Sequence, residues 1–145
     1  MMKIKLLIIF AAVLLLLSGC DRLAGLYPVE GPLAQSGQDG KIAVTFSSIG
    51  FGSQGKIEAT LADGEICGGE YTILPAGRTA EIFSFSLYAK YFGSGLAPQE
   101  ARYGQALFTG DKGTVFKAEF YLVRGVKQGY GLARDNKGNL YKLIW

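Results

Sequence analysis

The sequence predicts an all-β protein, a small antiparallel β-barrel or β-sandwich of about 6–8 strands that follows a signal peptide and a tether. Short segments rich in Val, Ile, Phe, Tyr and Thr recur at intervals of roughly ten residues, with turn residues between them. No long segment carries the apolar period of a helix. The 145 residues include 21 glycines, and glycine within strands marks the bulges and bends that a curved sheet needs.

Residues 1–19 are typical of a secretory signal peptide. Lys3 and Lys5 precede an unbroken apolar run, Leu6 to Leu17, which ends in the small residues Ser18 and Gly19. A helix that spans a bilayer needs about 20 apolar residues, so this run is too short to remain as a membrane helix. A basic start, a short apolar centre and small residues at the end instead indicate a leader that is removed.

Leu17-Ser18-Gly19-Cys20 resembles the lipobox of bacterial lipoproteins, in which an apolar residue and two small residues precede a cysteine. The resemblance implies that the Cys20 thiol receives a diacylglyceryl group, that cleavage occurs before Cys20, and that the new amino group is acylated. Two or three chains, each contributing about 0.8 kcal/mol per buried methylene, make release from a membrane negligible. The protein is therefore expected in the cell envelope, facing the periplasm. Asp21 favours the inner membrane, because an aspartate at this place tends to retain enteric lipoproteins there, but inner versus outer membrane stays open.

Residues 20–40 are expected to form the lipidated N-terminus and a flexible tether. This stretch contains Tyr27-Pro28, Gly31-Pro32 and the polar run Gln35 to Gly40, with few periodic apolar residues. A flexible chain of about 20 residues has a root-mean-square reach of about 25 Å, enough to hold a domain clear of lipid headgroups. In the alternative, Leu26 to Val29 dock on the domain.

Residues 41–145 are expected to form a single antiparallel β domain. The predicted strands are, in order, Lys41–Ser47, Gly55–Leu61, Glu65–Leu74, Glu81–Lys90, Tyr103–Thr109, Thr114–Arg124, Gly129–Arg134 and Asn139–Trp145. Gly64, Gly113 and Gly138 each stand where a tight hairpin needs a positive φ. The Glu81–Lys90 strand rests on the alternation of apolar and polar residues. Residues 80–92 also fit an amphipathic helix, and the sequence leaves that alternative open.

The composition excludes most common hydrolase mechanisms. The chain has no histidine, which removes Ser-His-Asp and Cys-His nucleophiles and imidazole metal ligands. Cys67 is the second of two cysteines, so no intrachain disulfide forms if Cys20 carries a thioether. Its strand-like surroundings hold no adjacent cation, which predicts a buried, unreactive thiol rather than a nucleophile or redox centre. We therefore expect no enzyme activity and no catalytic residue.

Two patterns that resemble ligand sites are better explained by a hairpin and by exposed strand faces. Gly50, Gly52 and Gly55 have the spacing of a dinucleotide fingerprint, but that site needs a helix and a crossover to a parallel strand. Only Lys56 to Ala62 precede the next turn. A set of acids lacks the dense spacing of a calcium loop and is expected on solvated faces: Glu58, Asp63, Glu65 and Glu70. The sequence thus predicts neither a cofactor nor a metal site.

Three kinds of surface are candidates for partner binding. Exposed aromatics would bind a ligand such as a glycan; the candidates are Phe51, Tyr88, Tyr91 and Phe92. An uncovered edge strand would dock an envelope protein by strand addition. Basic residues of the C-terminal third would face anionic lipid, unless they are only solvated strand faces: Lys112, Lys117, Arg124, Lys127, Arg134, Lys137 and Lys142. The expected compartment excludes nucleic acid.

The last strand ends in Trp145 and resembles the terminal aromatic strand of outer-membrane barrels. Such a barrel needs several strands of about 10 residues with an outward apolar band, and most strands predicted here are shorter. We therefore expect Trp145 to lock the strand into a water-facing domain.

Beyond the lipobox, the mature chain resembles a family of small proteobacterial lipoproteins that have no assigned activity. The segments that carry the resemblance are Leu26–Leu33, Leu61–Glu65, Gly69–Tyr71, Gly129–Asp135 and Gly138–Tyr141. The resemblance implies an envelope location and a β fold, and no functional residue other than Cys20. The sequence thus predicts a lipid-anchored, non-catalytic binding or structural module. The second hypothesis is an envelope adaptor or inhibitor that docks by strand addition. The third is a hydrolase or redox enzyme.

Overall fold

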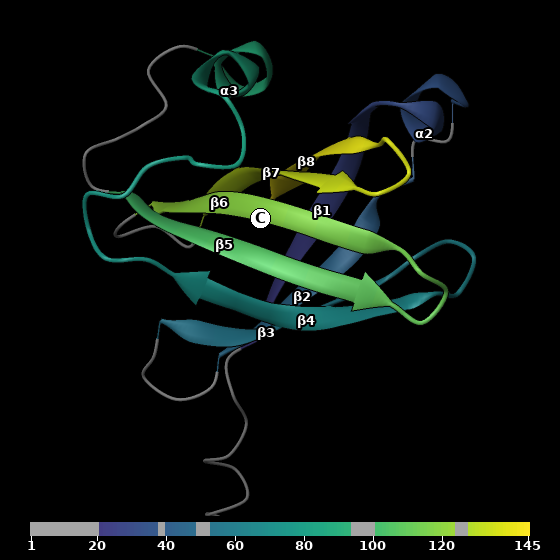
Figure 1. Cartoon of the computed structure of the whole chain (residues 1–145), viewed down its shortest axis with the longest axis horizontal. Helices are drawn as coiled ribbons and strands as arrows, with labels where there is room; N and C mark the ends of the chain where they lie inside the picture. The colour runs from purple at the N-terminus through teal and green to yellow at the C-terminus, as the bar shows by residue number, and fades with distance from the viewer. Residues whose placement is uncertain (1–20, 38–39, 49–52, 94–100, 124–127) are drawn as a thin grey trace, which may run out of the picture.

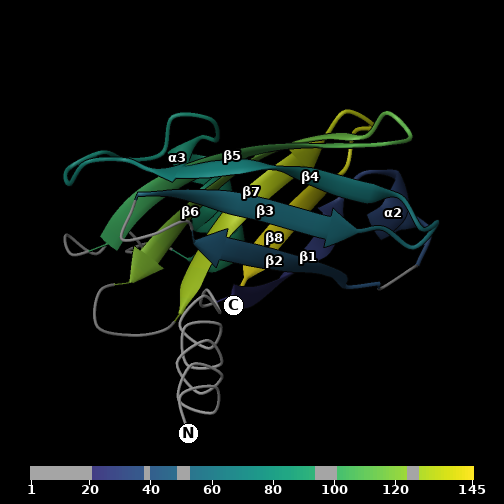
Figure 2. The same ribbon diagram turned by 90° about the horizontal axis from the view of Figure 1, so that it is seen from below.

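The computed structural model describes residues 21–37, 40–48, 53–93, 101–123 and 128–145 (Figure 1). Its strands form one closed barrel in which each strand is antiparallel to the next in the chain, and the last pairs with the first. The strands are β1 (Asp21–Glu30), β2 (Ile42–Ser48), β3 (Gln54–Thr60), β4 (Ile66–Ile73), β5 (Ala101–Gly110), β6 (Val115–Val123), β7 (Gly129–Asp135) and β8 (Leu140–Ile144). The all-β prediction is confirmed, with a barrel rather than a sandwich. In Figure 2, β7 and β8 run at a steep angle behind β2 and β3, as in a closed barrel of tilted strands.

The prediction of a flexible tether over residues 20–40 is wrong for Asp21–Glu30, which form β1. This strand pairs with β2 from Asp21 to Leu26 and with β8 from Gly25 to Glu30. Inward-facing Ala24 and Leu26 are buried in the barrel. Pairing of β1 with β8 removes the open edges that a seven-stranded sheet would leave. The β domain therefore begins at Asp21 rather than at Lys41, and the short helix α2 (Pro32–Gln35) connects β1 to β2.

The remaining predicted strands agree with the structure, except for Glu81–Lys90. Each of the other seven lies within two residues of a strand at both ends. The predicted hairpin glycines Gly64, Gly113 and Gly138 have φ of 84°, 93° and 89°. Residues Phe85–Phe92 form helix α3, which confirms the alternative that the sequence had left open. Ser84 caps the helix by accepting a hydrogen bond from the Leu87 N–H, and Gly93 ends it with φ of 87°.

The barrel interior is filled by side chains. Inward-facing residues of every strand belong to one buried cluster, in which aromatic rings alternate with small residues such as Ala59, Ala106, Ala118 and Ala133. Outward-facing residues of β3 are exposed and polar: Gln54, Lys56, Glu58 and Thr60. On β3 the alternation therefore separates the packed interior from a polar, exposed outer face.

A second buried cluster lies outside the barrel, where residues 74–93 cover the outer faces of β5 to β8. We call this segment the outer strap. Figure 1 shows α3 standing outside the strands. Its Tyr88 is buried against Tyr121 of β6, with ring centroids 5.6 Å apart, and Phe92 packs on Tyr130 of β7. Burial of an apolar outer face explains why Tyr103, Leu132 and Leu140 are buried although they point away from the interior.

Candidate functional site: an arginine-lined barrel mouth

The sequence-predicted acids do not converge on one site. Glu58 and Glu70 are exposed on outward faces, and Asp63 is exposed in the turn before β4. The expectation of a solvated position is wrong for Glu65, whose side chain is fully buried. It accepts hydrogen bonds from the Thr114 hydroxyl (2.6 Å), the Thr114 N–H (3.0 Å) and the Lys112 N–H (2.9 Å). These bonds, that of the Thr114 hydroxyl above all, hold the pKa of Glu65 below its usual range. Glu65 thus fixes the β5–β6 turn.

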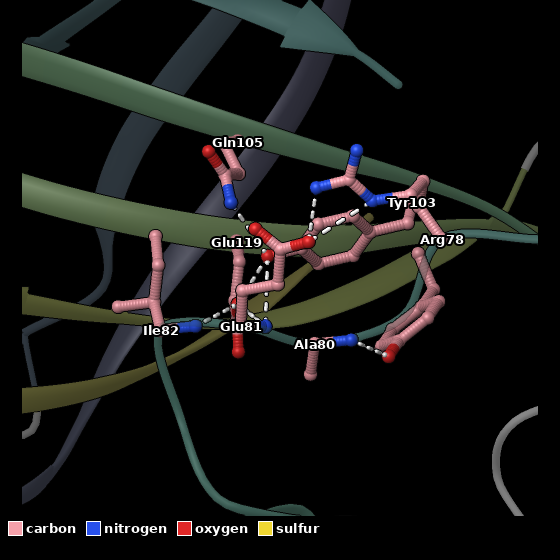
Figure 3. Close-up of polar contacts among 8 residues, drawn as sticks. Arg78, Ala80, Glu81, Ile82, Tyr103, Gln105 and Glu119 are labelled. Carbon is pink, nitrogen blue, oxygen red and sulfur yellow. Dashed lines mark hydrogen bonds and ion pairs between the residues drawn. The ribbon is translucent and has the colours of Figure 1, made fainter. Parts of the chain in front are cut away.

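Two buried acids that the sequence analysis missed also bind backbone. Asp135 accepts from the Lys137 and Asn139 N–H groups and from the Tyr141 hydroxyl. Glu119 points outward from β6 under the outer strap (Figure 3) and accepts from the N–H groups of Glu81 (3.1 Å), Ile82 (2.9 Å) and Phe83 (2.9 Å). The Tyr103 hydroxyl donates to the same carboxylate. The carboxylates of Asp135 and Glu119 thus hold backbone and hydroxyl donors in place. Their burial is tolerated because these donors surround them.

Cys67 is a buried core residue, as predicted. Its side chain is fully enclosed by the interior cluster. Burial first, and then the nearby charges of Glu65, Asp111 and Asp63, raise the pKa of the thiol to about 11. The thiolate, which is the reactive species, is therefore scarce at neutral pH.

Of the glycine pattern, the structure describes Gly55, which lies in an antiparallel pair of strands. β2 and β3 are antiparallel neighbours, with Ser48 opposite Gly55. Gly50 and Gly52 lie outside the described residues. A dinucleotide site of the predicted type requires two parallel strands joined by a helix, so this pair of strands does not provide its framework.

The predicted aromatic patch is wrong for Tyr88, which is buried between α3 and β6, and Phe51 lies outside the described residues. Tyr91 and Phe92 are half-buried in the outer cluster. Two of the predicted basic residues cover aromatic rings: Arg134 lies 5.5 Å from the ring centroid of Phe83, and Lys142 lies 5.1 Å from that of Phe92. Lys112, Lys117 and Lys137 are exposed, and Arg124 and Lys127 are not described by the structure.

A different group of residues forms the strongest candidate site, at the barrel end where β1 begins. A pocket of about 250 Å³ opens there. We call it the arginine mouth; its lining residues are Arg22, Phe46, Ser48, Tyr71, Ile73, Arg102, Phe120, Leu122 and Trp145. Arg22 continues the inward-facing series of Ala24 and Leu26, and Arg102 continues that of Gly104 and Ala106. Because β1 and β5 are half the barrel apart in strand order, the guanidinium groups come from opposite walls.

The floor of the arginine mouth is aromatic. The Phe46 ring lies 5.3 Å from Tyr71, 5.4 Å from Phe120 and 5.3 Å from Trp145, centroid to centroid. Two glycines make room for these rings: a Cβ at Gly129 would lie 2.1 Å from the Trp145 ring, and one at Gly104 would lie 2.5 Å from the Phe120 ring. Such packing gives the mouth a rigid apolar base.

In the described part of the chain, the nitrogen-bearing side chains of the mouth lack protein partners. Within the described part of the chain, neither the Arg22 nor the Arg102 guanidinium makes a hydrogen bond or ion pair. The Trp145 Nε1 is buried and has no hydrogen-bond partner there either, a situation that costs about 1–3 kcal/mol. No acid is among the described residues that line the pocket. Burial raises the pKa of Tyr71, and the positive charge of Arg22 opposes this shift. Unpaired donors above an apolar floor suit a ligand with an anionic group and an apolar part.

The opposite barrel end holds a pocket of about 260 Å³ beside α2. Its polar wall includes Asp135 and Asn139, which bond to each other, and the Asn139 side chain also accepts from the Leu33 N–H. These groups are already occupied by protein. The arginine mouth is therefore the better candidate for a ligand.

Sequence reasoning missed Arg22 and Arg102 because they fell in a predicted tether and in a predicted loop. The signal was that each arginine lies two residues before a buried, inward-facing residue of its strand, Ala24 for Arg22 and Gly104 for Arg102. That spacing has meaning only once β1 is recognised as a strand.

Comparison of the chain with protein-family models, with curated proteins and with solved structures finds no significant match. The lipobox and the wider resemblance to proteobacterial lipoproteins thus remain predictions from the sequence. Within the described residues, no helix is both long enough and apolar enough to cross a membrane. Nor do three or more Cys, Asp or Glu side chains in that part of the chain gather as metal ligands would.

Proposed function

We propose that this protein is a lipid-anchored, non-catalytic binding module of the bacterial cell envelope, attached to a membrane through acyl groups on Cys20 and facing the periplasm. One observation carries the proposal: β1 begins at Asp21, directly after the lipobox cysteine, and its second residue, Arg22, lines the arginine mouth. An extended chain advances about 3.3 Å per residue, so an anchor at Cys20 would hold Arg22 within reach of the lipid headgroups. The mouth would then lie against the membrane surface. Asp21 favours the inner membrane by resemblance.

A binding role is supported by the state of the potentially reactive groups. The buried acids Glu65, Glu119 and Asp135 are engaged by backbone and hydroxyl donors. The Cys67 thiol is enclosed and protonated at neutral pH. Among the described residues that line the arginine mouth, by contrast, the hydroxyls of Ser48 and Tyr71 have no carboxylate or thiol beside them that could act as a base. This arrangement binds charge rather than transferring protons or groups.

Strand addition to a protein partner, the alternative function, finds little support in the topology. Each of the strands that the structure describes is paired on both sides. A peptide would have to displace β1 or β8 before it could add to the sheet. A protein partner, if one binds, would use a mouth or an outer face instead.

Acylation at Cys20 is tested by replacing that cysteine. We expect the wild-type chain to incorporate labelled palmitate, to fractionate with membranes and to yield an N-terminal peptide whose mass shows acylated Cys20. Cys20→Ala should abolish the label and leave an uncleaved precursor. Cys67→Ala is the matched control, since it removes the other cysteine and should leave acylation intact.

The proposal fails if the Cys20→Ala protein matures and partitions like the wild type. It also fails if the label is lost in Cys67→Ala and kept in Cys20→Ala.

A further inference from the structure

We propose that the arginine mouth binds the headgroup of an anionic phospholipid, with its phosphate between Arg22 and Arg102 and the first part of an acyl chain against the aromatic floor. This inference rests on the proposed function, because the Cys20 anchor is what holds the mouth at a bilayer. It goes further by naming the site and the class of ligand. Both arginines lie outside the group of basic residues that the sequence alone associated with lipid.

The charge of the mouth selects an anion. Arg22 and Arg102 enter from opposite walls, and in the described part of the chain neither has a counter-ion. Asp21 lies next to Arg22 but belongs to the outward-facing series of β1. A guanidinium donates two parallel hydrogen bonds to phosphate oxygens, so two of them can hold one phosphate from both sides. A choline group beside that phosphate would instead meet two like charges.

The floor of the mouth selects an amphiphile over a free phosphate. Phe46, Phe120 and Trp145 present rings to the pocket, so a bare phosphate would lose water there without gaining apolar contact. An acyl chain or glycerol backbone would cover the rings. The unpartnered Trp145 Nε1 adds a donor for an ester or hydroxyl oxygen in the same wall.

The site also lies where such a lipid would be available. Leu23, the neighbour of Arg22 on the outer face of β1, is 76% exposed and would touch the membrane surface beside the anchor. The opposite pocket, next to α2, would point away from the bilayer. Of these two end pockets, the arginine mouth is therefore the one placed to take a lipid from the membrane that would carry the anchor.

Trp145 makes the binding measurable, because it is the single tryptophan of the chain and lines the mouth. The mature acylated protein is placed in nanodiscs of phosphatidylcholine that contain either brominated phosphatidylglycerol or brominated phosphatidylcholine at equal mole fraction. Bromine on an acyl chain quenches tryptophan at short range. We expect stronger quenching by the phosphatidylglycerol, and no loss of that preference when inorganic phosphate is added in excess.

The variants are Arg22→Gln and Arg102→Gln, each of which should raise the half-quenching mole fraction of phosphatidylglycerol about tenfold. Lys56→Gln is the matched control. It removes one cation near the same barrel end, since Lys56 pairs with Ser47 opposite Asp21, but the lysine lies on the outward face. The control should keep the wild-type preference. Urea unfolding of each variant verifies that the barrel is intact.

Equal quenching by the two brominated lipids would overturn the inference, as would a preference that Lys56→Gln removes to the same extent as the arginine variants. If excess inorganic phosphate abolishes the preference, the site binds a free anion rather than a lipid, and this result would also overturn the inference. If the mass of the N-terminal peptide shows no acyl group, the proposed function fails separately. The variants are then titrated in solution with dihexanoylphosphatidylglycerol, with dihexanoylphosphatidylcholine as the neutral counterpart, and the site is judged by the same tenfold criterion.

Discussion

Buried carboxylates hold the irregular parts of this protein to its barrel. Glu65 fixes the turn between β5 and β6 through Lys112 and Thr114, and Asp135 does the same for the turn between β7 and β8. A carboxylate suits this task because its two oxygens accept several backbone N–H groups at once. The same property predicts how the protein responds to acid.

Glu65 is expected to make folding sensitive to low pH. Its pKa is lower in the folded barrel than in the unfolded chain, so its stabilisation is complete above its ordinary pKa and is lost as the pH falls through the folded value. Glu65→Gln should therefore unfold more easily at pH 7 and show a shallower loss of stability below about pH 4. Urea unfolding followed by Trp145 fluorescence measures both. Glu70→Gln, an exposed acid of the neighbouring strand β4, should behave like the wild type. A Glu65→Gln curve parallel to the wild-type curve would contradict this role.

At the scale of the element, the outer strap shows where local sequence patterns mislead. Phe83, Phe85 and Leu87 alternate with polar residues as in a strand, yet Phe85 begins α3 and is 71% exposed. The Ser84 cap and the final Gly93 were visible in the sequence. What the sequence did not show was the apolar outer face of β5 to β8, which supplies the surface on which Tyr88 and Leu87 pack. Tertiary contact therefore decided between helix and strand.

Glu119 is expected to be the anchor of the outer strap. Glu119→Ala would leave the N–H groups of Ile82 and Phe83 and the Tyr103 hydroxyl without their acceptor, and the Glu81 N–H with only the Tyr103 oxygen, which should cost about 2 kcal/mol. Hydrogen exchange of those amides should accelerate, while exchange in β2 and β3 should change much less. Glu58→Ala serves as the control, because Glu58 is exposed on β3. Unchanged exchange at Glu81 to Phe83 would show that packing of α3 alone holds the strap.

At the scale of the whole molecule, the barrel was largely predictable and its closure was not. Seven strands and three hairpins followed from apolar alternation and from glycines at turns. β1 was missed for two reasons. Its exposed residues include the apolar Leu23 and Tyr27, so apolar and polar residues do not alternate along it, and a proline such as Pro28 is typical of the end of a strand. Pro28 is tolerated near the end of the strand, where the pairing with β8 shifts register. Since β1 supplies Arg22, missing the strand also meant missing the candidate site.

Deletion of β1 distinguishes a tether from a barrel strand. A chain in which Cys20 is joined directly to Gly31 keeps the lipobox and loses Asp21–Glu30. If these residues were a tether, the remaining domain would unfold with the same midpoint as the full chain. Because β1 pairs with both β2 and β8 and buries Ala24 and Leu26, the deletion should instead open the barrel and abolish cooperative urea unfolding. A matched deletion of residues 36–40, between α2 and β2, should leave the transition cooperative because it removes no strand. Loss of cooperativity in the first variant alone would make Asp21–Glu30 an integral strand of the barrel, so that the proposed anchor at Cys20 would lie close to the arginine mouth.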